Sequence, residues 1–161
     1  MSSKRISRRI AMLGLLALGG CGFAPIYGDG GAFRGAIAFE TPQSVAGFRL
    51  RERLEYRLGQ PGAPRYVLRV TLSEQRSPAA ITAAGDTTRF NVLGAAEWTL
   101  IAADTDAEIG AGEVATFTSY AATGSTVATQ AAATDATARL AVALADMLVS
   151  RLLILSPDLT P

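Results

Sequence analysis

Histidine is absent from this 161-residue sequence, and lysine and cysteine each occur once, as Lys4 and Cys21. Histidine is the side chain that most often acts as a general base near neutral pH, and it is also the commonest metal ligand. A Ser–Lys catalytic pair is equally excluded after residue 21, because no lysine follows it. The sequence therefore predicts a protein that is not an enzyme and holds neither a metal nor a cofactor.

A calcium loop is also unsupported, although Asp104, Asp106 and Glu108 alternate along one short segment. An EF-hand loop starting at Asp104 would need glycine at its sixth position and a carboxylate at its twelfth. Ile109 and Ala115 stand there instead. This segment is therefore expected to form a solvated turn between two strands.

Long apolar runs are scarce too, and the one near the N-terminus is short. Basic residues lie between Lys4 and Arg9, and an apolar segment follows from Ile10 to Leu18. A membrane-spanning helix needs about 20 apolar residues. The order of a basic segment, a short apolar segment and small residues is that of a secretory signal peptide. We predict that residues 1–20 are this peptide.

The single cysteine directly follows the predicted signal peptide. Leu18-Gly19-Gly20-Cys21 fits the bacterial lipobox, in which two small residues precede a cysteine whose thiolate is the reactive form. We expect cleavage between Gly20 and Cys21, and a diacylglycerol and an N-acyl chain on Cys21. One acyl chain holds a protein only marginally at a membrane, whereas two or three hold it firmly.

Positively charged residues are fewer than negatively charged ones after the predicted signal peptide. Of the 15 Lys and Arg residues, four lie in residues 1–20, which leaves 11 against 14 Asp and Glu and a net charge of −3. Nucleic-acid binding needs many neutralised phosphates, so no nucleic-acid partner is expected. Anion recognition would depend on individual arginines.

The mature chain suits one domain, which we place at residues 34–156 between a lipidated tether (21–33) and a tail (157–161). A strand is expected at 34–41, and a helix from Ser44 to a stop at Gly59. This helix would bury one face formed by Gly47, Leu50, Leu54 and Leu58.

Three strands are predicted to follow, at 66–73, 89–103 and 109–122, with a turn region at 77–88 and another at 104–108. Gly110 and Gly112 suggest a bulge or a close backbone contact in the third of these strands. A final helix should begin at Ser125 or Thr126 and end near Leu153. Its apolar stripe is predicted to comprise Leu140, Leu144, Met147, Leu148 and Leu152.

The expected order is thus β-α-β-β-β-α. A mostly antiparallel sheet with two helices packed on one face is the economical arrangement of these elements. The predicted fold class is α+β, a two-layer α/β sandwich.

Arg76 and Arg89 flank the predicted turn at 77–88. Guanidinium groups bind phosphate through two parallel hydrogen bonds, so these two arginines are candidates for contact with an anionic lipid. The alternative is that they are solvated charges that protect strand edges from aggregation. The residues alone leave both interpretations open.

Several segments together resemble one known family. They are CGFAPIYG directly after the lipobox, APRYVLRV, ITAAGDTTRFNVLGAAEWTL, FTSYAATGSTVAT and ARLAVALADMLVSRLL. The chain is similar over residues 21–155 to the lipopolysaccharide-assembly lipoprotein family LptE, in its alphaproteobacterial form. The start of the mature chain, C-G-F-x-P-x-Y-G, is the most specific of these pieces.

The resemblance implies a non-enzymatic protein anchored at the periplasmic face of the cell outer membrane. Such a protein plugs the LptD β-barrel, assists its assembly and supports the insertion of lipopolysaccharide into the outer leaflet. Basic residues near the turn between the second and third strands would contact lipopolysaccharide. That turn, AITAAGDTT, has no basic residue here, so Arg76 and Arg89 are the candidates. The alternative function is a lipoprotein that binds lipid A phosphates directly, without a barrel partner.

Overall fold

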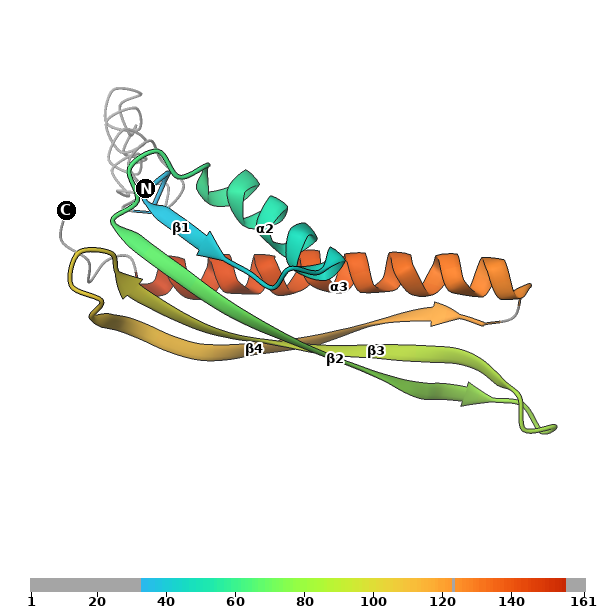
Figure 1. Cartoon of the computed structure of the whole chain (residues 1–161). Helices are drawn as coiled ribbons and strands as arrows, with labels where there is room; N and C mark the ends of the chain where they lie inside the picture. The colour runs from blue at the N-terminus through green and yellow to red at the C-terminus, as the bar shows by residue number, and fades with distance from the viewer. Residues whose placement is uncertain (1–32, 123, 156–161) are drawn as a thin grey trace, which may run out of the picture.

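The computed structural model describes residues 33–122 and 124–155, and it forms one elongated two-layer molecule (Figure 1). The predictions for Gly20, Cys21, the signal peptide and the tail lie outside these residues. The described elements are β1 (Ile37–Glu40), α2 (Val45–Leu58), β2 (Tyr66–Ile81), β3 (Thr87–Ala102), β4 (Glu108–Ala121) and α3 (Thr126–Leu155).

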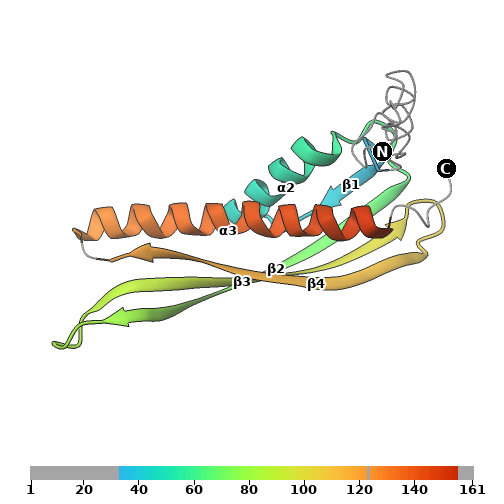
Figure 2. The same ribbon diagram turned by 180° about the vertical axis from the view of Figure 1, so that it is seen from behind.

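The four strands form one sheet in the order β1-β2-β3-β4. The β2–β3 and β3–β4 pairs are antiparallel, whereas β1 runs parallel to β2 and is joined to it through α2. Both helices lie on the same side of the sheet, as the two opposite views show (Figures 1 and 2). The predicted fold class and the order of its elements are confirmed.

The two faces of the sheet differ, and we name them by what covers them. The inner face lies under the helices and includes buried side chains such as Leu68, Val92 and Val114. The outer face points away from the helices and includes Leu93 and Phe117, which are exposed. Because side chains alternate along a strand, neighbouring residues of one strand lie on opposite faces.

Helix α2 begins and ends as the sequence predicts. The Ser44 hydroxyl caps the helix by accepting a hydrogen bond of 3.1 Å from the Gly47 amide. Gly59 follows the last helical residue with a φ of 85°, a backbone region that glycine adopts without strain. Its predicted apolar face is buried against the rest of the molecule, and it comprises Gly47, Leu50, Leu54 and Leu58.

Helix α3 has 30 residues and crosses the inner face along most of its length (Figure 2). Four of the five predicted stripe residues are buried, but Met147 is 36% exposed, so that part of the prediction is wrong. Met147 is one residue, about 100°, away from the buried Leu148, and this turns it toward the edge of the contact. Small residues such as Ala136 and Ala141 lie in the contact instead.

Asp146 of α3 joins the two helices. Its carboxylate accepts two hydrogen bonds of 3.0 Å from Arg53, and one of 2.6 Å from Arg57, both on α2. The hydrogen bond to Asp146 raises the pKa of the Arg53 guanidinium, against a smaller opposing effect of burial. Two of the four arginines of α2 are thus committed to a contact within the fold.

The predicted turn at 77–88 is wrong in its extent. β2 continues to Ile81 and β3 begins at Thr87, so the turn is confined to residues 82–86. The strands continue past Pro78 because the register shifts on either side of Ala80, and a bulge tolerates a proline that cannot donate to the ladder. The result is a long β2–β3 hairpin that projects beyond the rest of the sheet (Figure 1).

Gly110 and Gly112 behave as predicted. The register between β3 and β4 shifts between Leu100 and Ile101, opposite Gly110 and Glu108, which is a bulge. A side chain at Gly112 would meet the Trp98 ring at 3.3 Å, so the ring lies directly on the glycine.

Candidate functional site

Arg76 of β2 lies on the inner face of the sheet, and its side chain is about half exposed. It pairs directly with the buried Val92 across the ladder, which places both on that face. The Arg76 guanidinium is 3.6 Å from the Glu74 carboxylate, and Thr137 of α3 donates a 3.2 Å hydrogen bond to the same carboxylate oxygen. Glu74 is therefore the ion-pair partner of Arg76, at a partly exposed position where such a pair contributes little.

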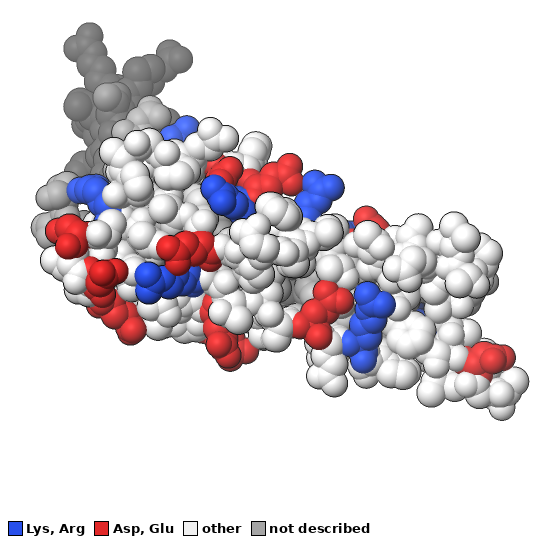
Figure 3. Space-filling view, viewed as in Figure 1, with Lys and Arg blue, Asp and Glu red and all other residues white. Residues whose placement is uncertain are grey.

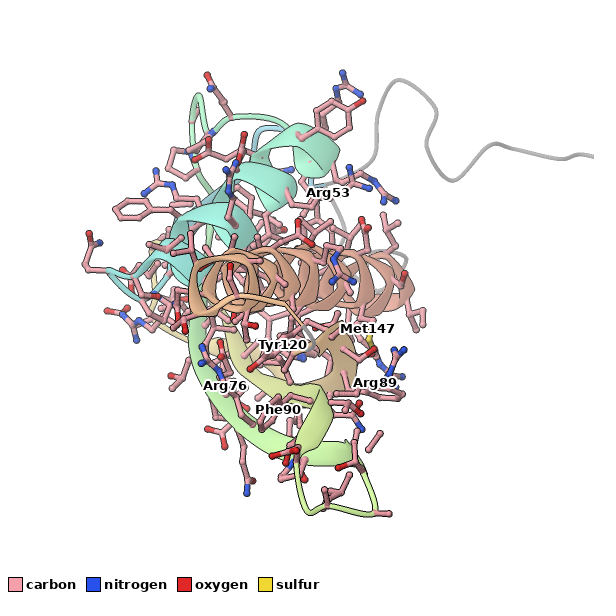
Figure 4. The ribbon with its side chains drawn as sticks, turned by 90° about the vertical axis from the view of Figure 1, so that its right-hand side faces the viewer. Arg53, Arg76, Arg89, Phe90, Tyr120 and Met147 are labelled. Atoms are coloured by element: carbon pink, nitrogen blue, oxygen red, sulfur yellow. The ribbon has the colours of Figure 1, made fainter. Side chains whose placement is uncertain are left out.

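Arg89 lies on the outer face. Its neighbour Phe90 stacks on Tyr120 of β4 under α3, with ring centroids 5.5 Å apart, so the alternation turns Arg89 the other way. Arg89 donates a hydrogen bond of 3.4 Å to the Ser119 hydroxyl. Figure 4 shows Arg76 and Arg89 on opposite sides of the hairpin. The structure does not bring the two predicted residues together.

A different arginine shares a contact residue with Arg89. Arg139 of α3 donates a 3.2 Å hydrogen bond to the Ser119 carbonyl oxygen and forms a 2.8 Å ion pair with Asp135. Ser119 thus links Arg89 and Arg139, although they are 50 positions apart. The four-residue spacing of Asp135 and Arg139 predicts their ion pair, but no local signal in the sequence predicts the contact with β4.

The outer face carries an apolar hollow across β2, β3 and β4. Leu93 and Phe117 are direct cross-strand partners and are 44% and 63% exposed. They line an open hollow of about 700 Å³ together with small and polar residues. The other outer-face residues of this hollow are Ser73, Gln75, Ala95 and Ala115.

Charge is distributed unevenly over the molecule. Between residues 77 and 96, only Asp86 and Arg89 carry a charge. On the face seen in Figure 3, most charged side chains lie over the half that contains β1 and α2. The hairpin is therefore an extended, nearly neutral surface that is rich in small side chains.

Residues 33–122 and 124–155 contain neither a candidate metal-binding group nor a candidate membrane-spanning helix. No group of three carboxylate, histidine or cysteine side chains is placed to hold a metal ion. In the same ranges, no helix combines the length and the apolar character needed to cross a bilayer.

Comparison with known families identifies the domain. The model of the LptE lipopolysaccharide-assembly family matches residues 36–152, which include all four strands, the whole of α2, and α3 as far as Leu152. The chain belongs to the LptE family. A search of curated proteins finds no match to the chain.

Solved structures share the LptE-type fold at low sequence identity. A candidate lipoprotein from Caulobacter crescentus CB15 superposes with a TM-score of 0.68 at 24% identity, over 86% of this chain and 99% of that one. Rare lipoprotein B from Shewanella oneidensis gives a TM-score of 0.57 at 15% identity, over 72% and 92%. A minor lipoprotein from Acinetobacter baumannii gives 0.57 at 17%, over 73% and 90%. These likenesses concern the fold.

Proposed function

We propose that this LptE-family protein is a lipoprotein of the outer membrane that plugs an LptD-type β-barrel. In this role it supports assembly of the barrel and insertion of lipopolysaccharide into the outer leaflet. The family match over residues 36–152 is the observation that carries the proposal. The protein would act by binding, without catalysis, cofactor or metal.

The surface of the domain fits a plug on physical grounds. The lumen of a large barrel is polar, and a nearly neutral surface of small side chains can approach such a wall closely. Alanine, glycine, serine and threonine also lose little rotamer freedom when they are covered. The hairpin between residues 77 and 96 has this character.

Anchoring belongs to the same proposal. A diacylglycerol and an N-acyl chain on Cys21, exposed after cleavage behind Gly20, would hold the domain at the periplasmic face of the outer membrane. Eleven residues lie between Cys21 and Phe33, where the described structure begins. An extended chain of that length spans at most about 40 Å, so the domain would stay close to the membrane surface.

Affinity capture tests the barrel partnership. The tagged protein is purified from detergent-solubilised outer membranes, and the proteins that copurify are identified by mass. We expect one large barrel protein at one-to-one stoichiometry. Depletion of the lipoprotein should also reduce assembled LptD and surface lipopolysaccharide. Normal levels of both after depletion would contradict the proposed function.

Direct lipopolysaccharide binding is a second candidate function, and the contact at Ser119 supports a revised version of it. Arg76 and Arg89 lie on opposite faces and share no contact residue within the described structure. Arg89 and Arg139 approach the edge strand β4 from its two sides, and both bond to Ser119 there. We propose Arg89 with Arg139 as the pair that would meet a lipid A phosphate.

Charge reversal separates the two functions. If the protein binds lipopolysaccharide directly, Arg89→Glu with Arg139→Glu should abolish that binding. If it acts as a barrel plug, the same double variant should leave barrel capture nearly unchanged. Arg76→Glu serves as the control, because it reverses a single charge on the other face of the hairpin. Equal lipopolysaccharide binding by all three proteins would exclude the Arg89–Arg139 site.

A further inference from the structure

The outer face of the sheet combines exposed apolar side chains with unbalanced negative charge. Leu93 and Phe117 face each other across β3 and β4 on this face, and no helix covers them. Four residues further along β3, Glu97 lies directly opposite Glu113 in the same register. At the rise of a strand, the two pairs are about 13 Å apart, so one partner surface can cover both.

The facing glutamates have no cation within the described structure. None of the ion pairs among residues 33–122 and 124–155 includes Glu97 or Glu113. Arg69 of β2 lies diagonally opposite Glu97 of β3 on the same face. Its guanidinium, however, pairs with the Glu40 carboxylate at 2.9 Å. Like charges directly opposite each other destabilise a sheet. A bound cation would remove this cost.

The missing cation does not come from the rest of the mature chain. Residues 21–32 and 156–161 contain neither lysine nor arginine. They could supply apolar contact to Phe117, but they could not neutralise the glutamates. The four basic residues before residue 21 belong to the predicted signal peptide.

Two other occupants are disfavoured by charge. A second copy that docked through the same face would bring its own Glu97 and Glu113 against this pair, which doubles the repulsion. A phosphate-bearing lipid would place further negative charge beside the two carboxylates. The chemistry that fits is a protein wall with an arginine or lysine next to apolar side chains.

We infer that the outer face is the surface through which this protein docks on the wall of its barrel partner. Basic side chains of the barrel would contact Glu97 and Glu113, and apolar side chains would fill the hollow at Leu93 and Phe117. This inference rests on the proposed function, since it names the face used in that complex. Exposed aromatic side chains near the centre of an interface often contribute most of its binding energy.

Capture of the barrel by surface variants tests the assignment. Leu93→Ser with Phe117→Ser should reduce capture at least about tenfold, and Glu97→Arg with Glu113→Arg should do the same. Replacing both glutamates by glutamine should have a smaller effect, because it removes the attraction without adding repulsion. The matched control is Tyr56→Ser on α2, which removes an aromatic side chain that is 79% exposed elsewhere. It should leave capture unchanged.

Photocrosslinking provides a measurement that does not depend on the stability of the variants. A photoreactive phenylalanine derivative at position 117 of the full-length lipoprotein should crosslink to the barrel in cells. Crosslinks to a second copy or to lipid alone would overturn the assignment. Capture at the wild-type level by both sheet variants, or an equal loss with Tyr56→Ser, would overturn it as well.

The outcomes also distinguish a wrong docking face from a wrong proposed function. Wild-type protein that captures the barrel, together with sheet variants that capture it equally, refutes only the docking face. Wild-type protein that captures no barrel refutes the proposed function, and the docking face falls with it.

Discussion

Gly47 is the position where one added methyl group should be most damaging. It is the third residue of α2, and a Cβ atom there would lie 2.0 Å from the carbonyl oxygen of Pro42 and 2.9 Å from the carbonyl carbon. Ordinary contact begins near 3.4 Å. The obstacle is backbone, so a side-chain rotation cannot relieve it. In Gly47→Ala, the start of α2 must move away from the segment that precedes it.

The expected cost combines three terms. Overpacking of a tight contact costs about 1–3 kcal/mol. The movement also strains the hydrogen bond from the Gly47 amide to Ser44, and a lost N-cap costs about 1 kcal/mol. Alanine returns up to about 1 kcal/mol through its higher helix propensity. We therefore expect Gly47→Ala to lower the free energy of unfolding by about 1–3 kcal/mol.

Urea unfolding followed by far-UV circular dichroism measures this loss. Gly62→Ala is the matched control, because a Cβ atom at Gly62 would meet nothing within 4 Å. That substitution should leave stability unchanged or raise it by less than about 1 kcal/mol. If Gly47→Ala proves as stable as wild type while Gly62→Ala behaves as expected, the steric reasoning about the start of α2 is refuted.

Three further predictions concern the contact between the helices, the core and the anchor. Asp146→Asn should lower the melting temperature by the same amount at pH 7 and pH 9. The raised pKa of Arg53 means that the stability from this contact is lost only as the pH rises through a value far above 9. A loss of melting temperature that differs between pH 7 and pH 9 would contradict this prediction. Leu54→Ala should cost about 2–5 kcal/mol in urea unfolding, since Leu54 is fully buried, and a loss below 1 kcal/mol would contradict the packing described. Cys21→Ala should move the protein from the outer-membrane fraction to the soluble periplasm; unchanged fractionation would exclude Cys21 as the anchor.

Local patterns in the sequence were sufficient for the features that depend on neighbouring residues. The helical spacing of Leu50, Leu54 and Leu58 predicts the buried face of α2, because a 3.6-residue period brings these side chains to one side. Ser44 and Gly59 predict its ends for the same local reason. The lipobox prediction for Cys21 likewise rests on adjacent residues, and it awaits the fractionation test.

Local sequence patterns do not predict the length of the β2–β3 hairpin. The run from Ser77 to Thr88 is rich in turn-forming and small residues, and this local composition predicts a turn throughout. In the folded protein, pairing with β3 holds this part of β2 extended as far as Ile81. Backbone hydrogen bonds across the ladder outweigh the weak local preferences of alanine and proline.

The order of the elements, the apolar faces of the helices and the number of charged residues all follow from the sequence alone. Which of those charged residues meet depends on how the strands pair and the helices pack. Strand register places Arg76 and Arg89 on opposite faces, joins Arg89 to Arg139 through Ser119, and sets Glu97 against Glu113. Side chains alternate along a strand, so a shift of one residue would reverse every one of these placements. Register is set by long-range packing of the whole sheet, which no short stretch of sequence contains.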